Sequence, residues 1–96
     1  VAGVLRDAGV VGVWGNHDHG LCRDVGEKAR ARASAATLDY MATFRGRLEL
    51  GGCHFSHVDP WVDPDDPANL WAFDGRPEDP DRLARSFAAV PHRAAF

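Results

Sequence analysis

The stretch from Val10 to Gly20 constrains this chain more than any other part of the sequence. An apolar run at 10–14 leads through Gly15 directly into four polar residues at 16–19. The run lacks polar alternation, which predicts a strand buried on both faces of a parallel sheet. Gly15 allows a tight exit from that strand and a close backbone approach to a bound group. Ligands collect beyond the carboxyl ends of strands in open α/β sheets, so we expect residues 16–19 to face a shared cleft.

The composition indicates at most one domain of an ordinary globular kind. The 96 residues are 45% hydrophobic and 26% charged, with a net charge of −3. This small negative charge gives no indication that the chain binds nucleic acid or a membrane surface. Two cysteines are too few for a disulfide framework, so we expect buried thiols and a reduced, cytoplasmic setting. We expect neither a membrane span nor a signal peptide, because no apolar run approaches about 18 residues and no charged-then-apolar leader occurs.

Both ends of the sequence suggest a piece of a larger domain. Residues 1–8 start without a methionine and already carry a helical apolar pattern, while residues 93–96 begin like a strand with no turn after them. We therefore expect 1–96 to be a single partial domain, incomplete at both ends.

The patterns along the chain predict helix, strand, helix, hairpin, helix and strand. The predicted helices are 1–8, about 27–46 and 80–90, and the strands are 10–14, 47–50, 53–57 and 93–96. Ser34 or Thr37 can start a second helical segment inside 27–46, and Gly51 with Gly52 makes the two-residue hairpin turn. This order predicts an α/β fold, a layered domain with a mixed sheet.

A long loop rich in aspartate and proline runs from Asp59 to Pro80. Loops of this length in compact domains are usually functional or ordered by their own aromatic residues, here Trp61, Trp71 and Phe73. Segment 63–69 superficially resembles a calcium loop, but it lacks the glycine at the sixth position and the closing glutamate. We expect a solvated acidic loop.

Asn16, His17 and Asp18 are the first residues able to do chemistry. The Asn16 carbonyl oxygen can bind Mn²⁺, Fe or Zn²⁺, and His17 can bind a metal or act as a general acid. Asp18 can orient His17 by accepting its second ring N–H. An isolated triplet of this kind more often forms a polar turn, but the preceding apolar run and Gly15 favour a functional site.

The other histidines divide by position. His57 ends the second hairpin strand and so repeats the arrangement of a strand followed by a ligand-type residue. His19 can pair with His17 in a metal site. His54 is predicted on the opposite side of its strand from His57, in a surface or supporting position, and His92, in a connection after Pro91, has no predicted role.

These motifs resemble those of the calcineurin-like metallophosphoesterases. Residues 13–18 are similar to that family's strand followed by Gly-Asn-His-Asp/Glu, and residues 55–60 resemble its strand that ends in a metal-binding histidine. Residues 93–96 resemble the strand that leads into the family's Gly-His-x-His motif. The resemblance implies an α/β/β/α sandwich with mixed sheets. It also implies that Asn16 and His57 bind one of two divalent metal ions (Mn, Fe, Zn or similar), that His17 protonates the leaving-group oxygen, and that Asp18 supports catalysis.

The implied activity is hydrolysis of a phosphomonoester or phosphodiester by a metal-bridged hydroxide, without a phosphoenzyme. The implied partner is a phosphorylated substrate whose identity the sequence leaves open. The family's Asp-x-His and Gly-Asp-x-x-Asp motifs, which precede Gly-Asn-His, and its closing Gly-His-x-His are absent from these 96 residues. Since those motifs supply most of the metal ligands, we expect the 96-residue chain to be inactive alone.

Two other hypotheses stay open at this point. A zinc-dependent amidohydrolase-like hydrolase would use His17 and His19, and replacing Asn16 with alanine separates the two enzyme hypotheses, since only the phosphoesterase should lose metal. A non-catalytic α/β module would instead bind a partner through the aromatic residues of the 59–80 loop.

Overall fold

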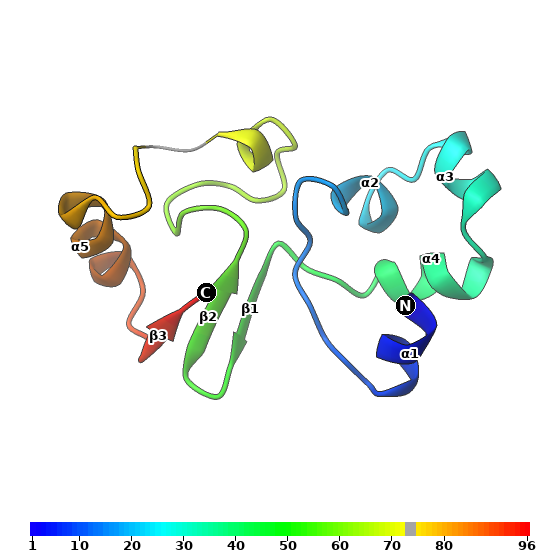
Figure 1. Ribbon diagram of the computed structural model, residues 1–96, viewed down its shortest axis with the longest axis horizontal. Coiled ribbons are helices and arrows are strands. Elements are labelled where there is room, and N and C mark those ends of the chain that lie inside the picture. Colours follow the sequence, from blue (N-terminus) through cyan, green and yellow to red (C-terminus); the bar gives the residue numbers. More distant parts are fainter. Residues whose placement is uncertain (73–74) are drawn as a thin grey trace.

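The computed structural model describes residues 1–72 and 75–96. Within these residues the fold is mixed α/β, with short helices around a three-stranded mixed sheet (Figure 1). The helices are α1 (Ala2–Asp7), α2 (His19–Cys22), α3 (Glu27–Arg32), α4 (Ala35–Met41), the 3-10 helix η1 (Asn69–Trp71) and α5 (Pro80–Ala89). The strands are β1 (Arg47–Leu50), β2 (Cys53–Ser56) and β3 (Ala94–Ala95).

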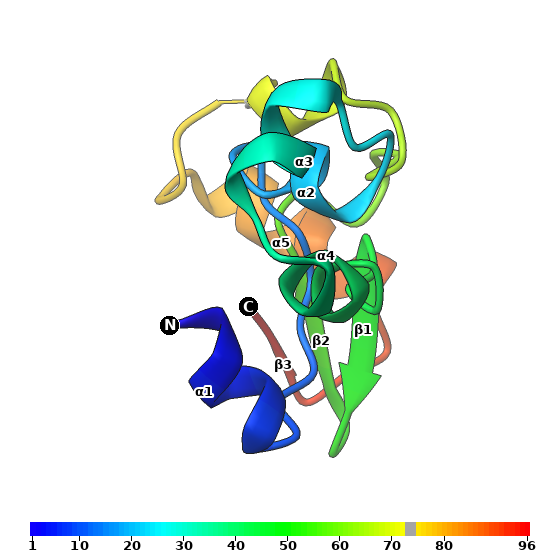
Figure 2. The ribbon, with the colours of Figure 1, turned by 90° about the vertical axis from the view of Figure 1, so that its right-hand side faces the viewer.

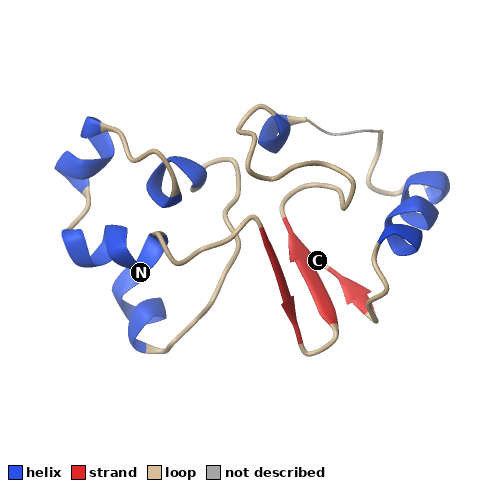
Figure 3. Ribbon diagram, turned by 180° about the vertical axis from the view of Figure 1, so that it is seen from behind, coloured by secondary structure: helices blue, strands red, loops and turns tan. Residues whose placement is uncertain are grey.

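The sheet stands between two groups of helices. Helices α1 to α4 gather on one side of it and α5 lies on the other (Figures 1 and 3). The molecule is flat, measuring 44 × 29 × 18 Å along its principal axes. Its radius of gyration is 14.9 Å, whereas roughly 12 Å is expected of a compact chain of this length. The core is therefore thin.

The predicted hairpin and mixed sheet are confirmed. Strand β2 is central, antiparallel to β1 and parallel to β3. Gly51 and Gly52 have φ of 59° and 74°, the left-handed values that a two-residue type I′ turn requires. The turn fixes the register, in which Glu49 pairs with His54, and His54 pairs on its other side with Ala95.

The predicted buried strand at 10–14 is wrong. This segment is extended, but its pairing within the described residues is a single parallel bridge between Val13 and Arg45. Arg45 lies just before β1, and from there the two segments diverge (Figure 1), so no ladder forms. Val11 is 58% exposed, and Trp14 is the one fully buried residue of the run.

The helical segment predicted over about 27–46 divides into α3 and α4 and ends at Met41, before the predicted end. The break coincides with Ser34, whose hydroxyl accepts a hydrogen bond from the Thr37 N–H at 3.2 Å and caps α4. One of the two internal starts predicted is thus confirmed. Tyr40 and Met41 at the end of α4 are buried in the core.

The first and last helices form where the sequence places them. Gly9, at φ 68°, follows α1, as glycine commonly follows a helix. Asp79 caps α5 by accepting the Asp81 N–H at 3.0 Å, with Pro80 in the first turn. No helix in the described residues is long and apolar enough to pass through a membrane.

Trp14 is the centre of the core. Its side chain is 1% exposed, and its indole N–H donates to the Pro64 carbonyl at 3.0 Å. The other buried members of this cluster are Cys22, Tyr40, Met41 and Leu70. Because Leu70 and Pro64 follow β2 while the rest precede β1, this cluster joins the N-terminal helices to the loop beyond the sheet.

The two cysteines are free, and their surroundings differ. Burial raises the pKa of the Cys22 thiol to about 11, so Cys22 is protonated at neutral pH and packs as a small apolar residue. Cys53 is half-buried. The prediction of buried thiols is therefore confirmed for Cys22 and wrong for Cys53.

We predict that Gly46→Ala lowers the free energy of unfolding by about 1–3 kcal/mol. A methyl group at Gly46 would lie 2.5 Å from Pro64 Cγ and 3.0 Å from Trp14 Cζ2, so the central packing must shift. Gly20→Ala is the matched control, because its methyl group meets nothing within 4 Å and should stabilise α2 by about 0.5–1 kcal/mol. Urea unfolding followed by circular dichroism measures both, and a Gly46→Ala variant as stable as the parent would contradict this packing.

Candidate functional site

The Gly15 turn and His57 lie against one another, although 42 positions separate them in the sequence. A Cβ atom placed on Gly15 would be 3.3 Å from His57 Nδ1 and 3.4 Å from its Cε1. Helix α2, η1 and the carboxyl end of β2 all lie at the same end of the molecule (Figures 1 and 2). The residue adjoining Asn16 therefore lies close to the predicted second ligand, His57, with no room between them for more than a methyl group.

The Nε2 atom of His57, the ring nitrogen that is not beside Gly15, is available to bind a ligand. Its Nε2 atom is buried and has no hydrogen-bond partner among the described residues. A buried imidazole nitrogen without a partner carries a desolvation cost of about 1–3 kcal/mol, and a metal ion or a substrate group would offset it. The strand-end position predicted for His57 is the one observed, one residue beyond β2.

The polar residues after Gly15 point to different neighbours. Asn16 is half-buried and His17 is exposed. The His17 ring lies edge-on to Trp71, with centroids 5.3 Å apart, so η1 of the long loop flanks the predicted general acid. The Asp18 carboxylate lies on the same side of Gly15 as His57, 3.6 Å from the Cβ position.

His19 belongs to the core. It is buried in α2 and packs edge-on against Trp14, with ring centroids 5.6 Å apart. The imidazoles of His17 and His19 thus pack against different aromatic residues, one in the loop after β2 and one in the core. This placement gives no support to a paired zinc site at these two histidines.

A cleft of about 250 Å³ opens beside His57, between β2 and α5. Leu83 and Phe87 of α5 line it and remain substantially exposed, so the apolar stripe of this helix faces the cleft. Asp59 and Arg82 meet in the wall of the cleft as a largely buried ion pair at 2.8 Å. This pair fixes α5 to the chain that leaves β2 and places one guanidinium in the cleft.

Aspartate side chains of the acidic segment 63–69 form hydrogen bonds to the backbone of the same segment. The Asp63 and Asp66 side chains accept N–H groups two residues further on, at 3.0 and 2.9 Å, as aspartates do in turns. Trp61 lies beneath the Arg85 guanidinium, 3.8 Å from its ring centroid. Phe73, the third aromatic residue singled out from the sequence, lies outside the described residues.

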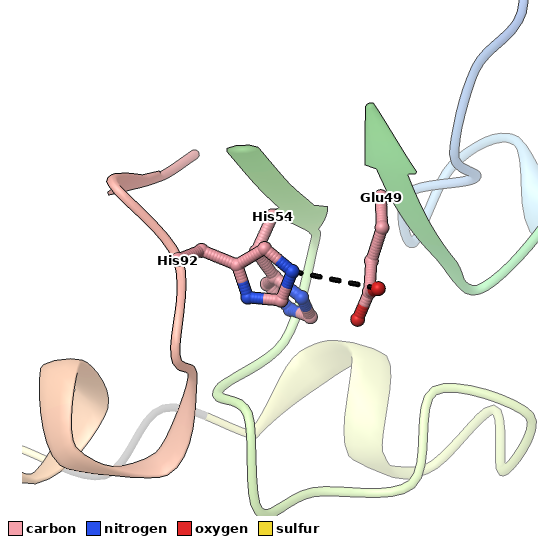
Figure 4. A group of neighbouring side chains, drawn as sticks. All are labelled: Glu49, His54 and His92. Carbon is pink, nitrogen blue, oxygen red and sulfur yellow. Dashed lines mark ion pairs between the residues drawn. The ribbon is translucent and has the colours of Figure 1, made fainter. Parts of the chain in front are cut away.

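The structure also contains a group that the sequence reasoning missed, formed by Glu49, His54 and His92 (Figure 4). His54 is 5% exposed and lines the same cleft as His57, so of its two predicted positions the surface one is wrong, and the supporting one stays a prediction. The hairpin register already pairs Glu49 with His54, and that signal was present in the sequence. Nothing in the sequence placed His92 beside them.

The pKa of His54 is lowered from its ordinary value of 6.5. Burial is the main cause, and the neighbouring His92 and Arg47 add to it. Glu49 acts in the opposite direction. His54 is therefore neutral at pH 7, which is the form that accepts a hydrogen bond or binds a metal.

We predict that the metal-free chain, kept in EDTA, loses stability as the pH falls below about 6.5. The unfolded chain binds a proton at His54 more readily than the folded chain does, so one histidine contributes a slope of at most about 1.4 kcal/mol per pH unit. His54→Leu should remove that part of the slope, and His17→Leu, at an exposed position, should retain it. Urea unfolding between about pH 7 and pH 5 measures the slope, and equal slopes in the parent and His54→Leu would refute the assignment.

Comparisons with known proteins found no matching family profile and no significantly similar curated protein or solved structure. The resemblance to the metallophosphoesterases accordingly rests on the sequence motifs, and we treat the activity it implies as a proposal.

Proposed function

We propose that this chain provides part of the catalytic centre of a metal-dependent phosphoesterase of the calcineurin-like kind. The observation that carries the proposal is the close approach of His57 to Gly15, with His57 Nδ1 3.3 Å from the Cβ position of Gly15. Two motifs that the resemblance pairs in one centre are far apart in sequence and adjacent in space. Such a meeting is expected of a shared site and is not required by the local propensities of either segment.

The donor set suits a divalent ion such as Mn²⁺, Fe²⁺ or Zn²⁺. Asn16 contributes a neutral amide oxygen and His57 an imidazole nitrogen, both ordinary ligands of these metals. The unpartnered, buried His57 Nε2 fits a ligand role. When bound, two such ions would supply Lewis acidity at the phosphoryl group and a nucleophile at neutral pH.

The general acid in this proposal is His17. It is exposed, directly follows Asn16 and is held on one side by Trp71. In the proposed hydrolysis, a hydroxide oxygen would bond to phosphorus as the ester P–O bond breaks, and the His17 proton would pass to the departing oxygen. Asp18, whose carboxylate lies 3.6 Å from the Cβ position of Gly15, would support catalysis from the same turn.

The sheet surface away from α5 supports the finer fold assignment. Leu48, Leu50 and Phe55 line one apolar surface together with Val11, and Leu50 and Val11 are exposed. In an α/β/β/α sandwich one face of each sheet packs on helices and the other on the second sheet. We propose that this apolar surface is the sheet-packing face of such a domain.

The test uses the full product of the gene that encodes these residues, loaded with Mn²⁺. It should hydrolyse p-nitrophenyl phosphate or bis(p-nitrophenyl) phosphate, while the 96-residue chain alone should not. His17→Asn should lower kcat by about 10²–10⁴-fold with metal content unchanged. Asn16→Ala and His57→Ala should lower both metal content and activity.

Asn69→Ala is the matched control for Asn16→Ala, because the Asn69 side chain donates to the backbone carbonyl of Asp63 within the long loop; it should retain activity. Hydrolysis that survives both Asn16→Ala and His57→Ala with its metal content intact would exclude these ligands. A full product without any phosphoesterase activity would exclude the function.

A further inference from the structure

The group of Glu49, His54 and His92 joins all three strands of the sheet. Glu49 lies on β1, its cross-strand partner His54 lies on β2, and His92 comes two residues before β3. One ligand atom from each residue lies within 4.8 Å of the other two. Figure 4 shows the two imidazoles side by side with the carboxylate facing them.

The histidines of this group have unused nitrogens. Neither ring nitrogen of His54 has a hydrogen-bond partner within the described residues, and His92 Nδ1 has none there. His54 is 5% exposed, so water does not readily replace the missing partner. A neutral imidazole always carries one N–H donor and one acceptor, and burying both without partners is rare in folded proteins. The side chain is therefore placed for a ligand.

The spacing is already close to that of a tetrahedral metal site. His92 Nε2 and Glu49 Oε2 are 3.4 Å apart, and the edge of a tetrahedron with bonds of about 2.1 Å is about 3.4 Å. The remaining separations, up to 4.8 Å, close with small rotations of the side chains. Glu49 is 68% exposed and His92 13%, so the exposed carboxylate is free to make this adjustment.

We propose that Glu49, His54 and His92 bind one Zn²⁺ ion, with solvent in the fourth position. Two imidazoles and a carboxylate are a common donor set of zinc sites that keep an open position. The ion would also hold β3, which pairs with β2 through only two residues, to the hairpin. This site is separate in its ligands from Asn16 and His57, and it does not depend on the phosphoesterase proposal.

The test measures Zn²⁺ binding by isothermal titration to the 96-residue chain after removal of metal with EDTA. Because the proposed catalytic residues can also bind zinc, the titration is done in an Asn16→Ala/His57→Ala background. This background should bind one Zn²⁺ per chain. Adding Glu49→Gln or His92→Gln should weaken binding at least about tenfold.

Both added substitutions are at residues less buried than His54, so the fold should survive them, and circular dichroism checks that it does. Zn²⁺ should also shift the ¹⁵N resonances of the His54 and His92 rings and leave those of His17 and His19 unchanged. The proposal fails if the background binds no zinc, if neither substitution weakens binding, or if the shifts appear at His17 or His19.

Discussion

The burial of Trp14 holds the parts of this molecule together. Its indole donates to the carbonyl of Pro64, its ring edge lies against Gly46, and its backbone N–H donates to Arg45. One side chain thus connects the helical N-terminal part to both the entry of the sheet and the loop beyond it. In a molecule this flat, few other buried residues share that task, so the position of Gly15, the next residue, follows from it.

The candidate site is a consequence of this anchoring. With Trp14 fixed, Gly15 can face the turn after β2, and the lack of a side chain lets the His57 ring come within contact distance. The candidate site therefore does not require the strand predicted at 10–14, which is wrong. It needs one anchored aromatic residue followed by a glycine, and a histidine just past the end of β2.

Local signals predicted much of the fold. The hairpin, the capped α5 and the Ser34 start were readable because turn and cap chemistry acts within a few residues. The prediction of a strand at 10–14 was wrong because a strand forms only beside a neighbouring strand. The apolar run alone carries no information about its partner, and its pairing is limited to one bridge with Arg45. His92 was missed for the same reason: only the return of the chain through α5 brings it to Glu49 and His54.

A nuclear Overhauser experiment on the 96-residue chain, between the Gly15 α protons and the His57 ring, tests whether the two motifs meet. We expect a cross-peak from Gly15 Hα to His57 Hε1, because the Cβ position of Gly15 is 3.4 Å from Cε1. Cross-peaks between the rings of Tyr40 and Phe44, which pack at 5.3 Å, show that the chain is folded. Their presence without the Gly15–His57 cross-peak would contradict the meeting of the two motifs.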